Sequence, residues 1–207
     1  ISKLASLDDI FLRHNTLTAF PVELFTLPRL SIISLEDNRI VSLPIPTEIP
    51  SKIQILHSVP QEVLPNIFIG SASSSKNRRS LANLQLTHHI VLTDPLGEHP
   101  HECNVSDHFF QERLLLQICD VEAQPLDDAI QQCNAFLETA VQAGHRILVN
   151  STLGVSRSAA IITAYMIKNL GVTYDEALAR LRAVRGNVKP NPGFEHQLRL
   201  YEKAHRS

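Results

Sequence analysis

The clearest chemistry in this sequence lies at residues 147–158, where a short apolar run of strand type leads into a tight polar loop. The loop contains Gly154 and continues into helix-type sequence from about residue 156 to 170. A strand, a tight loop and a helix in this order aim successive backbone N–H groups and the positive end of a helix dipole at one point, which suits phosphate. The planar guanidinium of Arg157 adds donors for phosphate oxygens. The predicted phosphate-binding residues are Ser151, Thr152, Leu153, Gly154, Val155, Ser156 and Arg157.

This stretch resembles the signature loop of the cysteine-dependent protein phosphatases, in its dual-specificity form. In that family a strand ends in His-Cys and continues x-x-Gly-x-x-Arg-Ser, and Gly154, Arg157 and Ser158 occupy the matching positions. The residues that carry the chemistry differ. Ser151 stands at the position of the nucleophilic Cys, and Asn150 at that of the preceding His. In the family the last Ser steadies the thiolate; here there is no thiolate, and we expect Ser158 to cap the helix instead.

The substitution at Ser151 has a direct chemical consequence. Attack on a phosphoryl group at neutral pH needs an ionised nucleophile, and a free Cys thiol has a pKa of about 8.5 that cations and helix N-termini lower further. A Ser hydroxyl ionises far less readily and needs an adjacent base. Asn150 cannot accept a proton, and the local sequence offers no other base. We therefore expect this loop to bind phosphate and not to cleave it.

The resemblance also implies roles for two polar residues outside the loop. Asp120 lies 31 residues before Ser151 (151 − 120), at the end of an expected strand. The family keeps its general acid there, so the resemblance implies that Asp120 would protonate the leaving oxygen; a solvated loop Asp is the alternative. Asn191 precedes a Pro and is predicted to cap the last helix. It belongs to residues 190–198, which resemble the family's closing motif.

Residues 1–45 contain an internal repeat. The pattern Leu7-x-x-Ile10-x-Leu12-x-x-Asn15-x-Leu17 recurs as Leu30-x-x-Ile33-x-Leu35-x-x-Asn38-x-Ile40, at an offset of 23 residues (38 − 15). This is the leucine-rich-repeat pattern, whose period of about 20–29 residues gives one strand per coil of a solenoid. Asn15 and Asn38 are expected inside, bonding the backbone across the turn. Two coils are too few to bury a core, so we expect that more repeats precede Ile1, that these lean on the next domain, or both.

The rest of the chain predicts an α/β domain. Residues 46–60 are Pro-rich and are interpreted as a stiff connector, or as a cap with one strand at residues 53–56. From residue 61 to 207 strand-like and helix-like segments alternate, which indicates a central, mostly parallel sheet flanked by helices. The resemblance to dual-specificity phosphatases covers about residues 60–206.

Composition bounds the function further. The net charge of −2 argues against a nucleic-acid binder with a basic patch. Cys103, Cys119 and Cys133 show no paired or metal-type spacing, and the His residues are scattered, so no metal and no cofactor are expected. The odd Cys count without a secretory leader suggests an intracellular, cytoplasmic location. No apolar run is long enough to span a membrane.

Three functions are compatible with this sequence. The first is a catalytically inactive, dual-specificity-phosphatase-like domain, a pseudophosphatase, that binds phosphorylated protein or another protein partner. The second is an active phosphatase for Ser, Thr and Tyr side chains that carries an engineered Cys-to-Ser change at Ser151. Such a change alone would leave His at the position of Asn150, which favours the first function. The third is a leucine-rich-repeat scaffold with a relic phosphate loop.

The class of ligand follows from the variable positions of the loop. Thr152, Leu153 and Val155 bring no positive charge to the site. Members of this superfamily that act on inositides or RNA typically add Lys or Arg there, because their ligands carry several phosphates. We therefore expect a single phosphorylated side chain of a protein, or a phosphate or sulfate ion, in the loop. The repeats are expected to offer a second protein-binding surface.

Overall fold

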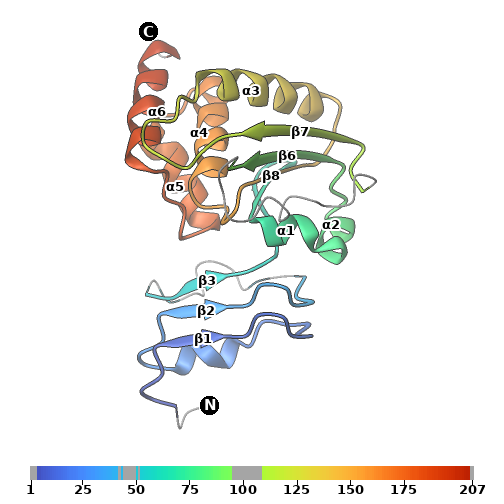
Figure 1. Cartoon of the computed structure of the whole chain (residues 1–207), viewed down its shortest axis with the longest axis vertical. Helices are drawn as coiled ribbons and strands as arrows, with labels where there is room; N and C mark the ends of the chain where they lie inside the picture. The colour runs from blue at the N-terminus through green and yellow to red at the C-terminus, as the bar shows by residue number, and fades with distance from the viewer. Residues whose placement is uncertain (1–3, 42, 44–49, 51, 95–108, 206–207) are drawn as a thin grey trace.

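The computed structural model describes residues 4–41, 43, 50, 52–94 and 109–205. The strands of its larger part are β4 (Gln61–Leu64), β5 (Ile67–Gly70), β6 (His88–Thr93), β7 (Glu112–Gln117) and β8 (Ile147–Asn150). They form a five-stranded sheet in the order β4-β5-β8-β6-β7 (Figure 1). Only the pair β4–β5 is antiparallel in this sheet. The mostly parallel sheet of an α/β fold is confirmed.

Helices lie on both faces of this sheet (Figure 1). One face carries α3 (Asp127–Gln142), α4 (Arg157–Leu170), α5 (Tyr174–Val184) and α6 (Pro192–His205), and the other carries the short α1 (Ala72–Lys76) and α2 (Arg78–Asn83). Successive strand residues point to opposite faces. On β5, Ile67 and Ile69 therefore join the core of α3–α6, whereas Phe68 packs in a second core with Leu81 of α2.

The central strand and the helix that follows it form the buried centre of the molecule. Every residue of β8 is buried, and α4 is buried from Arg157 to Ile167. A helix that is covered on all sides needs neighbours on all sides, and α4 contacts α3, α5, α6 and the sheet. It ends before Gly171, whose left-handed backbone (φ 63°) terminates it. The loop between β8 and α4 is therefore held at both ends by core elements.

The N-terminal part forms a second sheet. Its elements are β1 (Asp9–Phe11), the 3-10 helix η1 (Val22–Thr26), β2 (Ile32–Ser34) and β3 (Gln54–Leu56). The strands are parallel, in the order β1-β2-β3, and Asp9 pairs with Ile32, which pairs with Gln54. A core of Leu, Ile and Val side chains lies beside these strands. β3 lies in residues 46–60, for which the sequence predicts either a stiff connector or a cap with one strand. The structure contains that strand.

The two Asn residues of the repeat have different surroundings. Asn38 is 9% exposed; its Nδ2 donates to the carbonyl of Leu12 (2.7 Å) and its Oδ1 accepts from the N–H of Leu17 (3.0 Å). Asn15 is exposed, and its Nδ2 bonds the carbonyls of Leu12 and Arg13 in its own turn. The expectation that both lie inside is wrong for Asn15, because β1 is the edge of the described sheet and no described coil covers it.

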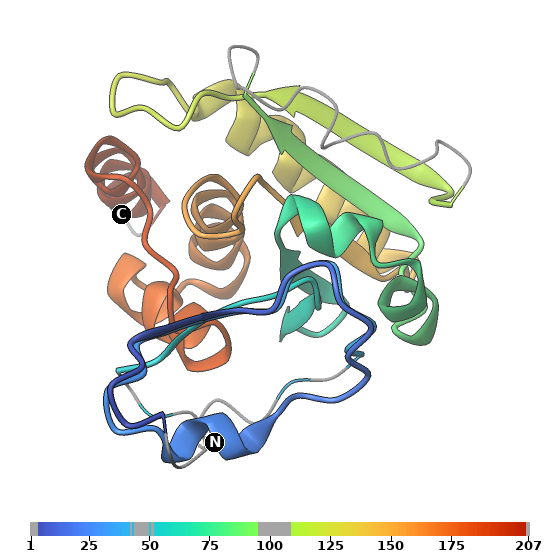
Figure 2. The ribbon, with the colours of Figure 1, turned by 60° about the horizontal axis from the view of Figure 1, so that its bottom comes forward.

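The N-terminal part packs on the rest of the chain below α1 and α5 (Figures 1 and 2). Asn77, at the start of α2, donates from Nδ2 to the carbonyls of Ile40 (3.3 Å) and Ser58 (3.0 Å). His57, directly after β3, places its Nε2 3.0 Å from Nη1 of Arg185, which follows α5. Both contacts join β3 and its neighbours to elements that surround the loop between β8 and α4.

Candidate phosphate-binding site

The loop between β8 and α4 has its carbonyl groups anchored from outside. Each carbonyl from Thr152 to Ser156 accepts a hydrogen bond. The donors are Ala72 N to Thr152 O (3.0 Å), Arg185 Nη2 to Leu153 O (3.0 Å), Arg185 Nε to Gly154 O (2.9 Å), Lys189 N to Val155 O (3.0 Å) and Ala160 N to Ser156 O (2.8 Å). Because C=O and N–H of a trans peptide point in opposite directions, anchoring the carbonyls outside turns the N–H groups inward.

The N–H groups of the same loop are left for a ligand. Within the part of the chain that the structure describes, no backbone N–H from Thr152 to Arg157 donates a hydrogen bond. These groups lead directly into the first turn of α4, whose dipole adds positive potential at the same place. Successive free N–H groups at a helix start have the geometry of an anion-binding site.

Gly154 allows the loop to turn this tightly. Its backbone is left-handed (φ +68°), and a Cβ at this position would lie 2.4 Å from the carbonyl oxygen of Gly70 at the end of β5. A side chain would therefore meet both backbone strain and a collision with backbone atoms. The loop can lie this close to β5 only because residue 154 is Gly.

Arg157 is buried beneath the loop, at 5% exposure. Its Nη2 donates to Thr152 Oγ1 (2.8 Å) and its Nη1 to the carbonyl of Ile118 (3.2 Å). Its Nε has no hydrogen-bond partner among the described residues and lies 3.9 Å from Oδ2 of Asp120. The guanidinium is thus held in place by protein oxygens and keeps one unpaired N–H.

Ser151 is 2% exposed, and its Oγ lies 3.2 Å from Oγ of Ser158. The sequence analysis predicts that Ser158 caps the helix, and this prediction is wrong. The N-cap position belongs to Ser156, and Ser158 lies one residue inside α4, where its side chain turns toward Ser151. Two neutral hydroxyls face each other, and among the described residues no base contacts Oγ of Ser151.

Asp120 is tied to the phosphate loop and to the start of α6. Its Oδ1 accepts from Oγ of Ser156 (2.6 Å) and from Nδ2 of Asn191 (2.9 Å). The N–H of Asn191 donates in turn to Oγ of Ser156 (3.1 Å), and Oδ1 of Asn191 accepts from the N–H of Phe194 (2.9 Å), which caps α6. The tertiary structure thus brings Asp120, Ser156, Arg157 and Asn191 together.

Asn150 is fully buried, and its Oδ1 lies 2.5 Å from Nε2 of His89 on the neighbouring strand β6. Burial lowers the pKa of His89 to about 3. The ring is therefore neutral at physiological pH, and its Nε2–H donates to the Asn150 oxygen. No sequence pattern connects these two residues, because they come from different strands.

Arg185 is the functional residue that the sequence analysis missed. It is 4% exposed, and besides the carbonyls of Leu153 and Gly154 it contacts Oε1 of Gln61 (2.9 Å) and the ring of His57. Burial lowers its pKa to about 10, so it is still a cation at neutral pH. Its place after the last helical residue of α5 gives no sequence signal, because its partners lie far away in the chain.

The described residues were compared with the requirements of a metal site and of a membrane-spanning helix. Among them, no three His, Cys, Asp or Glu side chains are grouped so that they could hold a metal ion. None of the described helices combines the length and the apolar composition needed to cross a membrane. Cys119 and Cys133 are free thiols, and Cys103 lies outside the described residues.

The five-stranded sheet, the tight loop after its central strand and the buried Arg157 define an α/β domain of the phosphatase type. Residues 67–204 match the family model of the dual specificity phosphatase, catalytic domain. The chain belongs to the dual-specificity phosphatase family.

The similar proteins include a phosphatase named for its leucine-rich repeats and a phosphatase-like interacting protein. The chain is 31% identical over 176 residues to MAP kinase phosphatase with leucine-rich repeats protein 3 of Dictyostelium discoideum, in a match that covers 82% of this chain and 19% of that protein. It is 32% identical over 148 residues to the human serine/threonine/tyrosine-interacting protein. That match covers 69% of this chain and 64% of the human protein. The crystal structure of the human tyrosine phosphatase-like serine/threonine/tyrosine-interacting protein superposes with a TM-score of 0.67 at 29% identity, over 72% of this chain and 98% of that one. This chain thus spans less than two thirds of the length of these curated relatives.

Proposed function

We propose that this chain is a pseudophosphatase domain, which binds a phosphorylated side chain of a protein partner in the loop between β8 and α4 and does not hydrolyse it. One observation carries the proposal: the loop combines anchored carbonyls and free N–H groups with a Ser at the nucleophile position. An anion held by these N–H groups and by Arg157 needs no thiol. A neutral hydroxyl in place of a thiolate also removes a negative charge that would repel a dianionic phosphate.

The surroundings of Ser151 support the absence of hydrolysis. A Ser hydroxyl becomes a nucleophile when a base takes its proton. The hydrogen-bond partner of its Oγ is the hydroxyl of Ser158, which is no stronger a base. Asp120 could act as a general acid from its place beside Ser156, but an acid for the leaving group does not activate the attacking one.

The environment of Asn150 supports a natural loss of the nucleophile over an engineered change. An engineered Cys-to-Ser exchange would leave position 150 untouched, and the buried amide there is matched by a neutral imidazole at 2.5 Å. The pair makes a hydrogen bond across two strands, which a buried polar group requires. This bond satisfies one polar atom of each side chain, whereas Nδ2 of Asn150 and Nδ1 of His89 are buried without a partner among the described residues.

We further propose that the N-terminal strands belong to a leucine-rich-repeat array that offers a second protein-binding surface. The parallel pairing of three strands, in which Asp9 lies opposite Ile32 and Ile32 opposite Gln54, supports this, as does the bond of the buried Asn38 to the carbonyl of Leu12. The name of the Dictyostelium relative supports it as well. Phe11 on β1 is 66% exposed, although large aromatic side chains are usually buried in the core or in an interface. In this proposal the partner contacts the repeats and the phosphate loop together.

The test measures binding and turnover in the same preparation. A fluorescent peptide with one phosphorylated Ser, Thr or Tyr is titrated with the wild-type chain and with Arg157→Ala, and hydrolysis of a small aryl phosphate is followed in parallel. We expect binding that the phosphate group requires, at least tenfold weaker binding by Arg157→Ala, and no turnover above the buffer blank. Ser151→Cys should restore little activity, and Asn150→His with Ser151→Cys should restore more.

The possible results separate the three functions. Wild-type turnover that Arg157→Ala abolishes would refute the pseudophosphatase. Full activity of Ser151→Cys alone would favour an active enzyme with an engineered Ser. Equal and negligible phosphopeptide binding by both proteins would mean that the loop is a relic and that the repeats carry the function.

A further inference from the structure

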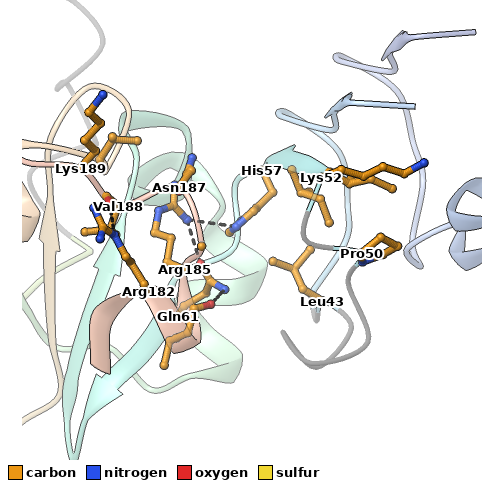
Figure 3. A pocket seen from close by; sticks show the side chains of 15 residues that line it. Leu43, Pro50, Lys52, His57, Gln61, Arg182, Arg185, Asn187, Val188 and Lys189 are labelled. Atoms are coloured by element: carbon orange, nitrogen blue, oxygen red, sulfur yellow. Dashed lines mark hydrogen bonds between the residues drawn. The ribbon is translucent and has the colours of Figure 1, made fainter. Parts of the chain in front are cut away.

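A cavity of about 820 Å³ lies between the N-terminal sheet and the connection from α5 to α6 (Figure 3). Leu43, Pro50 and Lys52 stand on one side of it, and Arg182 and Lys189 on the other. A volume of this size is typical of ligand sites, which measure about 300–1,000 Å³. Val155 of the candidate phosphate loop is one of the lining residues of this cavity, which is called the basic pocket below.

Among the described residues that line the basic pocket, the charged side chains are all cations. Lys52, Arg182, Arg185 and Lys189 line it, and no Asp or Glu is among the described lining residues. The whole chain carries a net charge of −2, so this excess of positive charge is a local property. A concave surface lined by one sign of charge raises the local concentration of the opposite sign.

These cations differ in how many hydrogen bonds they already make within the protein. Arg185 is fully engaged with the phosphate loop, His57 and Gln61, and Lys52 donates to the carbonyl of Pro28. Arg182 uses only Nε, which donates to the carbonyl of Val188 (3.0 Å). Arg182 and Lys189 are exposed, and their terminal nitrogens make no hydrogen bond within the described residues. These two can therefore bind an incoming carboxylate.

The remaining lining suits a polypeptide better than a small inorganic ion. Apolar side chains such as Ile53, Val155 and Val184 form part of the wall. Nδ2 of Asn187 is buried and has no acceptor among the described residues, so it is a donor in need of a partner. Apolar walls with a few unsatisfied donors and cations fit a segment that mixes aliphatic side chains and carboxylates.

The basic pocket also borders the phosphate loop. Val155 belongs to both, and the N–H of Lys189 holds its carbonyl (3.0 Å). Because Val155 borders both sites, a partner chain that occupies both would carry its two contact groups close together in sequence, at about 3.3 Å per extended residue. We propose that the basic pocket binds an acidic segment, rich in Asp and Glu, that lies a few residues from the phosphorylated side chain of the same partner. This inference rests on the proposed function and names the class of sequence that the site recognises.

The experiment compares two phosphopeptides by fluorescence anisotropy. They share one phosphorylated residue and differ only in a flank three to six residues away, which carries Asp and Glu in one and Asn and Gln in the other. The double variant R182Q/K189Q removes the two free cations. Its control, R180Q/K203Q, removes the same charge from exposed positions, one of them on the same helix. We expect the wild type and the control to bind the acidic peptide roughly tenfold more tightly than the neutral one, and the double variant to lose most of this preference.

Salt and a second phosphate complete the test. The preference should shrink in about 0.5 M NaCl, because screening acts on exposed charges. Equal affinity of the wild type for both phosphopeptides would overturn this inference and leave the proposed function intact, whereas no binding of either would overturn both. If R182Q/K189Q weakens only a peptide whose flank carries a second phosphate, the acidic segment is wrong and the pocket selects doubly phosphorylated chains.

Discussion

Nε of Arg185 donates to the carbonyl oxygen of Gly154 at 2.9 Å, across 31 residues of chain. The same guanidinium reaches the carbonyl of Leu153, so one buried side chain fixes the orientation of two successive peptides of the phosphate loop. Through His57 it also contacts the segment that follows β3. Arg185 therefore positions the loop without facing the ligand, and it joins the loop to the N-terminal part.

Replacement of Arg185 should weaken phosphate binding although the residue does not face the site. Arg185→Lys keeps the charge, but a single ammonium cannot reach both carbonyls, which then lose their outward anchor. We expect roughly tenfold weaker binding of inorganic phosphate by calorimetry and a loss of about 3 kcal/mol in the free energy of unfolding, since buried acceptors are left unpaired. Arg180→Lys, at an exposed position of α5, is the control. Unchanged affinity of a folded Arg185→Lys would contradict a positioning role.

A methyl group at residue 154 should destroy the site. Gly154→Ala places a Cβ 2.4 Å from the carbonyl oxygen of Gly70, so the loop must move away from β5. Gly144 is the matched control, because its φ is also positive (+77°) but nothing lies within 4 Å of the added Cβ. Gly144→Ala should cost only about 1–2 kcal/mol of backbone strain and leave phosphate binding intact. Phosphate titration combined with urea denaturation checks both, and equal effects of the two changes would refute the argument.

Removal of the Asp120 charge should strengthen anion binding. Oδ2 of Asp120 lies 3.9 Å from Nε of Arg157, so the carboxylate competes with a bound anion for the same cation. Asp120→Asn can still accept the hydrogen bond from Ser156 and removes the negative charge. Since the carboxylate is partly exposed, the gain is modest, about threefold in phosphate affinity. Weaker binding by Asp120→Asn in a calorimetric titration would show that the hydrogen bonds of the carboxylate matter more than its charge.

Mild acid should destabilise the protein through His89. Its pKa in the folded chain is about 3, below the ordinary value of 6.5. As the pH falls below 6.5, the unfolded chain takes up a proton at this residue and the folded chain does not, so stability is lost with decreasing pH. At pH 5.5 the loss is about 1.4 kcal/mol from this group. His89→Gln keeps a donor for Asn150 and should flatten the dependence of unfolding free energy on pH between 7.5 and 5.

The exposed His196 gives the comparison for that measurement. His196→Gln makes the same exchange at an exposed position of α6 and is the matched control for His89→Gln. A slope for His89→Gln as steep as that of the wild type would mean that His89 is not the group responsible. Burial also lowers the pKa of His57, which leaves part of the acid sensitivity in both variants.

Local sequence determined the parts of this protein whose physical cause is local. The alternation of apolar runs predicted the sheet and its helices, and the order of strand, Gly154 and helix predicted the phosphate loop, because capping and tight turns depend on neighbouring residues. The prediction that Ser158 caps the helix was wrong because its hydrogen bond depends on a tertiary contact and not on neighbouring residues. The partner of its hydroxyl, Ser151, is chosen by the path of the loop and not by helix sequence.

Tertiary structure alone decided the contacts that hold the candidate phosphate loop in its shape. Arg185 meets Leu153 and Gly154, His89 meets Asn150, and the basic pocket opens between segments more than a hundred residues apart. Neither Arg185 nor His89 belongs to a motif that the sequence analysis recognises. A buried donor or acceptor must find a partner, but which one it finds depends on how the strands and helices pack, and a single sequence does not contain that geometry in readable form.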